Sequence, residues 1–582
     1  MRVGAEYKGG VCSFTVWAPF KKNVYLELGK NKYAMQRDDN GYWHLEMNAK
    51  PGQNYFFIID EKKRPDPASR FQPMGVHGPC EIVDQNYKWQ DKNWKNIARK
   101  DLVIYELHVG TFTKEATFGA IIPRLNELKK MGINAIELMP VSQNPGKRNW
   151  GYDGVYPYAV QENYGGVLGL KNLVNACHKK GIAVILDVVY NHLGPEGNYF
   201  NDFAPYFTDK YKTPWGPAIN FDDSYSDQVR NYFIQNAMYW FREFHIDGLR
   251  LDAVHAILDM NARPFLQELS EKTNQLSKDL EKSLYLFAES NLNKSKLIRP
   301  VNKGGYGLDS EWLDDFHHSL HALLTGERQG YYIDYGSIEH LKKCINNAHV
   351  YDGVYSVSRK ASYGDSAKDI PKDKFIVFTQ NHDQVGNRLY GERLSKLVDF
   401  EALKLAAGCM LLFPYIPLIF MGEEYAEDNP FLYFIDHCDK SLIKAVREGR
   451  KKEFSSFNWT ANPPDPKSKT TFEKSKLDWK KRNTGKHKVM KEFYTELIRL
   501  RKKQDGNVKA LSKRNLLILG SSGFTAVFNF NGTEKHHKPG PGKKLLDSAE
   551  KRWLGPGSVI PKTLKRDTNI ILPPKGFVLF QR

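Results

Sequence analysis

Cysteine is scarce in this sequence, and the few that occur form no recognisable arrangement. The 582 residues contain six, spread from Cys12 to Cys438, with no C-x-x-C pair or other metal-ligand spacing. This excludes a disulfide scaffold and a zinc module, and it favours a reducing compartment. We therefore expect a cytoplasmic protein.

Long apolar runs are also missing. The N-terminal residues MRVGAEYKGG lack the apolar segment of a signal peptide. The most apolar stretch, residues 406–422, is shorter than the roughly 20 residues that a spanning helix needs, and Pro414 and Pro417 interrupt it. It is better explained as the buried end of a helix followed by a buried strand, so no membrane partner is predicted.

Acidic residues are outnumbered by basic ones, 67 to 85, which leaves a net charge of +18. A basic chain suggests a nucleic-acid partner. The lysines are scattered, however, and the densest cluster, residues 447–452, has no aromatic residues interleaved. A solvated basic surface is the better interpretation, and no nucleic-acid partner is predicted. An aromatic content of 13% excludes a disordered chain.

The two ends of the chain have the pattern of antiparallel sheets. Short apolar or alternating runs, such as SFTVWAP and NYFFIID, recur about every ten residues near the N-terminus. We predict an immunoglobulin-like β-sandwich of the carbohydrate-binding kind at residues 1–97. Alternation returns in FTAVFNF and GFVLFQR, which predicts a small C-terminal β domain at residues 507–582.

The middle of the chain alternates buried strands with amphipathic helices. Runs such as IAVILDVV and LYLFA are apolar on both faces, as parallel strands covered by helices must be. Six or seven runs are clear, and an eighth is predicted at Glu311–Phe316. A doubly wound sheet is the competing fold, but no phosphate-type glycine turn follows the first strand. We therefore predict an α/β fold with a (β/α)8 barrel at residues 98–506.

Ionisable side chains stand where the predicted strands end. In a barrel these C-terminal ends share one face, which is where barrel active sites lie. Each carboxylate alone could cap the following helix, but capping does not explain the whole set with Arg and His interleaved. The residues concerned are Asp187, Asn191, His192, Arg250, Asp252, Glu289 and Gln380–Asp383.

The spacing of these residues indicates an acid–nucleophile pair. Arg250 and Asp252 are two apart on a strand, so their side chains point the same way. A neighbouring guanidinium favours an ionised Asp252. Glu289 follows an apolar run, and such surroundings with adjacent carboxylates raise a carboxyl pKa, as a general acid requires. One ionised and one protonated carboxyl is the arrangement used in glycoside hydrolysis.

Four segments resemble the signature regions of the α-amylase superfamily, and they occur in the family's order. They are DVVYNH (187–192), DGLRLDAVH (247–255), FAES (287–290) and QNHDQ (380–384). The resemblance implies that Asp252 is the nucleophile, Glu289 the acid/base and Asp383 the third carboxylate. It also implies that Arg250, His192, His382 and Tyr152 line the sugar subsite at the reacting carbon.

Within the superfamily the chain is most similar to the maltooligosyltrehalose trehalohydrolases, through TPWGPAINFD (213–222), WLDDFHHSLHALLTGE (312–327) and HDQVGNR (382–388). The resemblance implies a retaining hydrolase of trehalose biosynthesis that cuts the α-1,4 bond next to the terminal trehalose of maltooligosyl trehalose. It implies a maltooligosyl trehalose synthase as pathway partner. The implied substrate-binding residues are Tyr152, Asp187, His192, Trp215, Arg250, Leu251, Ala253, Val254, His255, Asp314, Asp315, Phe316, His317, His318, His382, Gln384, Val385, Gly386 and Asn387.

Two alternatives remain open. A glucan branching enzyme is a transferase with the same three carboxylates, although the segment HDQVGN replaces the SHDE expected of branching enzymes. A catalytically silent glucan-binding protein on an amylase scaffold is the other alternative, and the intact trio Asp252, Glu289 and Asp383 argues against it.

No cofactor and no metal are predicted. Calcium-dependent amylases use an Asn of the NH pair as a ligand, and Asn191 is present, but the insertion that completes that site is not evident before Asp252. The segment EKHHKPGPGKK (534–544) suggests nickel or zinc binding, but a solvated Pro/Gly turn is the better interpretation.

Overall fold

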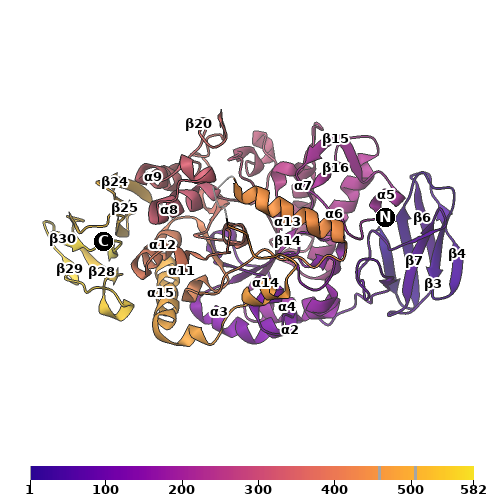
Figure 1. The fold of residues 1–582 in the computed structure, drawn as a ribbon, viewed down its shortest axis with the longest axis horizontal. Helices are drawn as coiled ribbons and strands as arrows, with labels where there is room; N and C mark the ends of the chain where they lie inside the picture. Colours follow the sequence, from indigo (N-terminus) through magenta and orange to yellow (C-terminus); the bar gives the residue numbers. More distant parts are fainter. Residues whose placement is uncertain (1, 456–460, 504–507) are drawn as a thin grey trace.

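The computed structural model describes residues 2–455, 461–503 and 508–582. Figure 1 shows an N-terminal pair of sheets in indigo at the right, a central barrel, and a C-terminal sheet in yellow at the left. The first N-terminal sheet has the order β1 (Gly4–Lys8), β2 (Val11–Trp17), β6 (Tyr42–Asn48), β5 (Gln36–Arg37). The second has the order β4 (Asn31–Ala34), β3 (Val24–Leu28), β7 (Asn54–Ile59), β8 (Lys62–Arg64), and β9 (Cys80–Glu81) pairs with β7.

Alternating side chains hold the two N-terminal sheets together. Along β3, buried residues alternate with half-buried ones, as expected for a strand with one face on a core. Phe14 from one sheet and Leu26 and Phe57 from the other are completely buried in the same apolar cluster. The predicted β-sandwich architecture is therefore present.

Eight parallel strands close into a barrel, which confirms the predicted fold and excludes the doubly wound sheet. Closure is made by β10 and β23, the first and last barrel strands, which pair with each other. The predicted eighth run is the short strand β19. In order, the strands are β10 (Ile104–Leu107), β11 (Ala135–Leu138), β14 (Ala183–Val188), β17 (Gly248–Leu251), β18 (Tyr285–Ala288), β19 (Ser310–Trp312), β22 (Phe375–Val377) and β23 (Ile416–Phe420).

Helices surround the barrel strands. The helix predicted over 117–132 is broken into α2 (Phe118–Ile121), a 3-10 turn at Ile122–Arg124 and α3 (Leu125–Met131), because Pro123 lacks the N–H that a continuous helix needs. The other long helices are α4 (Gly166–Lys179), α6 (Ser226–Glu243), α7 (Phe265–Asp279), α8 (Asp314–Thr325), α9 (Ile338–Asn347), α12 (Phe400–Leu412), α13 (Lys440–Ser455) and α15 (Gly485–Arg501). Short helices are α1 (Val109–Phe112), α5 (Phe200–Phe203), α10 (His382–Gly386), α11 (Leu394–Leu397) and α14 (Lys469–Lys474).

The most apolar stretch of the sequence forms the end of α12 and then β23, as predicted. Among the helices of the described residues, none has both the length and the apolar character needed to cross a bilayer. Three short hairpins extend from the barrel: β12 (Ser142–Gln143) with β13 (Tyr156–Val160), β15 (Phe207–Thr213) with β16 (Gly216–Ile219), and β20 (Tyr355–Ser356) with β21 (Ala361–Ser362).

The C-terminal sheet packs on α12 and α15 of the barrel. Gly408 of α12 is required there, because a Cβ would lie 2.5 Å from the ring of Phe577. The sheet has the order β24 (Lys509–Lys513), β25 (Leu516–Gly520), β26 (Phe524–Asn529), β31 (Phe577–Gln581), β28 (Gly542–Asp547), β29 (Thr563–Leu564).

The segment predicted to be a solvated turn, residues 534–544, is partly a strand. Lys535–His537 form β27, which pairs with β30 (Ile570–Leu572). The prediction was wrong at these residues because the partner strand lies more than 30 residues further along the chain, where local sequence gives no sign of it.

Candidate active site

A buried guanidinium organises the C-terminal mouth of the barrel. The Nη1 of Arg250, on β17, lies 2.8 Å from Asp187 Oδ2 and 2.7 Å from Asp252 Oδ1. Its Nη2 lies 3.6 Å from Glu289 Oε2. Asp187 and Arg250 are register partners on β14 and β17, and Glu289 directly follows β18. One cation therefore gathers three carboxyl groups from three neighbouring strands.

Glu289 has the protonation behaviour that the sequence predicts for it. Burial, together with the charges of Asp252 and Asp383, raises the pKa of this carboxyl to about 7. The Arg250 charge and a hydrogen bond from the N–H of Ala253, 2.7 Å from Oε2, act in the opposite direction. A carboxyl with a pKa near neutrality is suited to donating and accepting a proton in turn.

The backbone after Asp252 is arranged to make that hydrogen bond. Ala253 has a φ of +40°, in the left-handed region that non-glycine residues rarely adopt. The turn points the Ala253 N–H at Glu289, so Ala253 contributes to the site through its backbone and not through its side chain. Leu251 and Val254 are buried on either side. His255 is less enclosed, and burial lowers its pKa.

A phenol and an imidazole connect the remaining groups. Tyr152 Oη donates to Asp187 Oδ2 at 2.6 Å and lies 2.7 Å from His382 Nε2, and its ring stacks on that imidazole. Asp383 Oδ1 is 3.5 Å from the same His382 nitrogen, with 41% of the Asp383 side chain exposed. The structure therefore brings all three predicted catalytic carboxylates to one mouth, with Asp383 open to a ligand.

An aromatic wall stands beside this cluster. The rings of His192 and Trp215 stack with centroids 4.8 Å apart and an interplanar angle of 9°. Trp215 lies in the turn between β15 and β16, and 48% of it is exposed. His192 Nε2 donates to the backbone carbonyl of Tyr152 at 3.0 Å, which fixes the imidazole. The wall therefore offers an indole face to a sugar ring.

The two aspartates that begin α8 have different surroundings. Burial, then the charges of Glu289, Asp315 and Asp383, raise the pKa of Asp314, so its carboxyl lies within electrostatic reach of the carboxyl cluster. Asp315 faces the protein interior, where its Oδ2 accepts a hydrogen bond of 2.7 Å from Asn293 Nδ2. Of this pair, only Asp314 is brought to the carboxyl cluster.

The next three residues of α8 are also mostly internal. Phe316 is completely buried, and His317 Nδ1 donates to the Thr379 carbonyl at 2.7 Å. His318 packs against Tyr331, with ring centroids 4.4 Å apart. Tyr331 in turn donates to Gln384 Oε1 at 3.2 Å. His318 is therefore connected to the mouth only indirectly, through Tyr331.

The residues after Asp383 form α10. Val385 is buried, and Gly386 is pressed against Trp150, because a Cβ there would lie 2.1 Å from the indole. Asn387 Nδ2 donates to Asp383 Oδ1 at 3.3 Å, which links α10 to the third carboxylate.

Sequence reasoning missed two glutamates beneath the site. Glu106 on β10 and Glu137 on β11 are register partners, and each is 1% exposed. Glu106 Oε1 is 2.5 Å from His382 Nδ1. Both stand in runs predicted to be buried, YELHV and NAIEL, and a charged residue in such a strand must face the barrel interior. A glutamate within an apolar strand run could therefore have identified both residues from the sequence.

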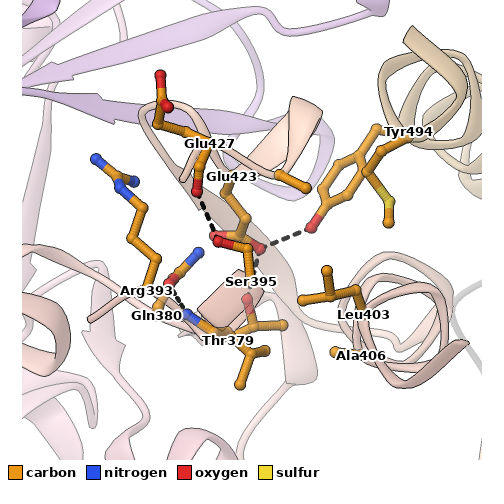
Figure 2. A pocket seen from close by; sticks show the side chains of 12 residues that line it. Thr379, Gln380, Arg393, Ser395, Leu403, Ala406, Glu423, Glu427 and Tyr494 are labelled. Atoms are coloured by element: carbon orange, nitrogen blue, oxygen red, sulfur yellow. Dashed lines mark hydrogen bonds between the residues drawn. The ribbon is translucent and has the colours of Figure 1, made fainter. Parts of the chain in front are cut away.

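A third missed glutamate anchors the strand that leads to His382. Figure 2 shows Glu423, at the end of β23, between Thr379 and Tyr494. Its Oε1 accepts from Thr379 Oγ1 at 2.5 Å and from Tyr494 Oη at 2.8 Å. The small cavity beside it, about 10 Å³, has room for no more than a water. Glu423 therefore ties the end of β22 to α15.

Asn191 does not stand among metal ligands. It is buried, and neither atom of its amide has a hydrogen-bond partner. Within the parts of the chain that the structure describes, no group of three or more His, Cys, Asp or Glu residues is arranged to hold a metal ion.

Comparison with known proteins defines the family. The alpha amylase catalytic domain model matches residues 106–215 and 218–510. The malto-oligosyltrehalose trehalohydrolase of Saccharolobus solfataricus is 51% identical over 493 residues, which cover 84% of this chain and 85% of that protein. The chain belongs to the malto-oligosyltrehalose trehalohydrolases of the alpha-amylase family.

More distant comparisons agree with this family. This trehalohydrolase-family chain is 29% identical to a 1,4-alpha-glucan branching enzyme of Francisella tularensis, over 71% of its own length and 69% of that protein. A crystal structure from Salmonella typhimurium, described as an alpha amylase, superposes with a TM-score of 0.90 at 35% identity and covers 100% of this chain and 99% of that one.

Proposed function

We propose that this family member is a retaining glycoside hydrolase that cuts the α-1,4-glucosidic bond next to the terminal trehalose of maltooligosyl trehalose and releases trehalose. The observation that carries the proposal is the Arg250 guanidinium, which contacts Asp187, Asp252 and Glu289 at one mouth. The relative from Saccharolobus solfataricus bears the name of that activity.

In the first step, Asp252 attacks the anomeric carbon on the non-trehalose side of the bond. Arg250 Nη1 donates to Asp252 Oδ1 at 2.7 Å, and this charge-assisted hydrogen bond holds the carboxylate in place. The bond from that carbon to the leaving oxygen breaks as Glu289 transfers its proton to the oxygen. Trehalose departs, and the glucan chain stays as an ester on Asp252.

In the second step, Glu289, now ionised, removes a proton from water. The water oxygen attacks the same anomeric carbon, and the bond to Asp252 breaks. The carboxylate of Asp252 is regenerated, and Glu289 is again protonated. A retaining enzyme needs about 5–5.5 Å between its two carboxyl groups, and their common contact with Arg250 supports that spacing.

We assign Asp383 to the hydroxyls of the distorted sugar ring, because its exposed carboxylate lies beside the reacting pair. Specificity for trehalose must come from the leaving-group side. Trehalose is bent and non-reducing, so it needs polar contacts of its own. Asp314, Gln384 and the Trp215 face are our candidates. Leaving buried polar groups unpaired rejects a wrong substrate by several orders of magnitude.

Product analysis on maltotriosyl trehalose tests the proposal. We expect free trehalose and maltotriose as main products, with much slower hydrolysis of plain malto-oligosaccharides. Formation of α-1,6 branches on amylose, without release of trehalose, would replace the proposal with a branching enzyme. Binding without turnover of either substrate would favour a silent glucan-binding protein.

The cellular location of the protein and the source of its substrate are part of the same proposal. All six cysteines are unpaired, which suits a reducing cytoplasm. A maltooligosyl trehalose synthase is the enzyme that we expect to supply the substrate. Cell fractionation tests the location, and coupled synthesis of trehalose from maltooligosaccharides, with both enzymes present, tests the supply.

A further inference from the structure

Glu106 makes two contacts with a single residue of the proposed site. Its Oε1 lies 2.5 Å from His382 Nδ1, and its Oε2 accepts the backbone N–H of His382 at 3.1 Å. Both residues are 1% exposed. A buried carboxylate held this way fixes the imidazole in position and rotation.

The partner on the opposite side of the ring settles how many protons the ring carries. Tyr152 has one hydroxyl hydrogen, and Asp187 Oδ2 accepts it at 2.6 Å. Burial outweighs the charge of Arg250, which binds Asp187 at 2.8 Å and 2.9 Å, and raises the pKa of Asp187 to about 6. At pH 7 its ionised, accepting form therefore predominates. The Tyr152 oxygen, 2.7 Å from His382 Nε2, must therefore accept a hydrogen from that nitrogen.

Both ring nitrogens thus face acceptors, since Nδ1 meets a carboxylate and Nε2 meets a phenol oxygen. Only the imidazolium form donates from both. Its positive charge also faces Asp383 Oδ1 at 3.5 Å. We propose that Glu106 is a positioning residue that holds His382 as an imidazolium, which orients Tyr152 and pairs with Asp383 at the reacting subsite.

The charges around His382 support this assignment. Burial lowers the pKa of His382, but Asp383 and Glu106 outweigh burial and raise it to about 9. Burial lowers the pKa of the neighbouring His108 to about 4, so that ring is neutral. The titratable groups that face His382 come from five elements and one loop. They are Glu106 and His108 at β10, Glu137 on β11, Asp187 on β14, Arg250 on β17, Asp383 on α10, and Tyr152 in the loop between β12 and β13.

Glu137 supplies a matched control. It is as buried as Glu106 and is its register partner, yet neither of its oxygens has a hydrogen-bond partner. Burial, then the charges of Glu106 and Asp187, raise its pKa well above the usual range. Replacing Glu137 with Gln keeps the size of the buried side chain and leaves the contact between Glu106 and His382 intact.

The primary test is NMR of the full chain carrying ¹⁵N-labelled histidine, with a His382→Gln variant to assign the signal. In the wild type, His382 should stay an imidazolium at pH 7 and titrate near pH 9. In Glu106→Gln it should be neutral at pH 7, because the fixed negative charge is gone. Glu137→Gln should keep the wild-type titration. A neutral His382 at pH 7 in the wild type overturns the proposal, whether or not any variant folds.

The kinetic arm rests on the proposed function. Glu106→Gln should lower kcat/KM for trehalose release by about 10- to 100-fold, the range expected for one charge-assisted hydrogen bond, and Glu137→Gln should stay within about threefold. An imidazolium at pH 8 in a folded Glu106→Gln variant, or equal losses in both variants, contradicts the proposal. If the wild type releases no trehalose, the proposed function fails while the NMR result still decides the role of Glu106.

Discussion

Buried carboxyl groups stand at the two ends of the barrel, before β17 (Asp247) and after the neighbouring strand β18 (Glu289), but their surroundings differ. Asp247 accepts hydrogen bonds from Trp94 Nε1 at 2.7 Å, Val184 N at 2.7 Å and His178 Nε2 at 2.8 Å, and Lys282 Nζ is 2.9 Å away. Burial raises its pKa, but Lys282 and His178 outweigh burial, and the net pKa falls below the usual range.

At the other end, Glu289 has the opposite balance. It has one backbone hydrogen bond, from Ala253 at 2.7 Å, and Arg250 only at 3.6 Å. Its pKa is therefore raised to about 7. Both carboxyl groups are buried, so burial alone does not explain the difference. The number of hydrogen-bond donors and cations around a barrel carboxyl decides whether it is fixed as an anion or remains able to exchange a proton.

The largest effect is expected at the proposed nucleophile. Asp252→Ala should lower kcat by roughly four orders of magnitude or more, because no covalent intermediate can form. Fold and substrate binding should be largely intact. Steady-state kinetics, circular dichroism and calorimetric binding of substrate check this. Turnover within about tenfold of the wild type would exclude Asp252 as the nucleophile.

The next effect belongs to the proposed acid. Glu289→Gln should lower kcat on a natural glucan by about 10²–10⁴-fold, the usual contribution of general acid catalysis. The first step should be spared with an α-glucosyl fluoride, whose leaving group needs no proton. Burst kinetics with both substrates provide the measurement. Equal losses on the two substrates count against Glu289 as the acid.

The pH profile tests the same carboxyl without a mutation. Because the proton of Glu289 is needed and its pKa is about 7, kcat/KM should fall about tenfold per unit above that pH. Since the folded pKa is raised, ionising Glu289 also costs stability between its ordinary pKa of 4.5 and about 7. Unfolding of Glu289→Gln across that range should lack this dependence. An alkaline limb beginning well above pH 8 contradicts the assignment.

A smaller effect on catalysis, but a clear one on stability, is expected at Asp247, at the opposite end of the barrel. Asp247→Asn leaves His178 and Lys282 without their buried anion, which should cost about 3–5 kcal/mol. The kcat of the folded fraction should stay within about twofold. Thermal unfolding and active-site titration measure the two quantities.

The pH dependence of that variant sharpens the test. The folded pKa of Asp247 is lowered, so its contribution is present above the unfolded value near 4 and is lost as the pH falls further. Asp247→Asn should therefore lose less stability than the wild type below pH 4. A large fall in kcat at neutral pH would show that the two ends of the barrel are coupled.

The smallest effect is expected from metal removal. Prolonged EDTA treatment should leave kcat and the unfolding temperature unchanged, because the residues around Asn191 do not form a metal site in the described structure. Loss of activity on EDTA treatment, with recovery on adding calcium, would show the prediction to be wrong.

Much of the site was predictable because the C-terminal end of a barrel strand can be recognised in the sequence. A strand buried on both faces is a continuous apolar run, and its C-terminal end is where polar residues resume. Asp187, Arg250, Asp252 and Glu289 stand at such points, and the structure gathers them. The limits predicted for the three domains, 1–97, 98–506 and 507–582, remain a prediction.

Side-chain direction beyond the strand ends was not predictable. Asp314 and Asp315 are adjacent in the sequence, yet one faces the carboxyl cluster and the other faces the interior. Asp315 is fixed by Tyr335 and by the backbone N–H of Val350, which follow it by 20 and 35 residues. No local pattern identifies such partners.

The sequence by itself determined the closed barrel and the residues at its mouth, because apolar periodicity and residue type are local properties. Only the tertiary structure decided which carboxyls are partnered, because ionisation depends on contacts between distant segments. Glu106 and His382 are 276 residues apart, yet they share a hydrogen bond. Glu106 and Glu137 look alike in the sequence, and only the position of His382 decides which of the two carboxyl groups is hydrogen-bonded.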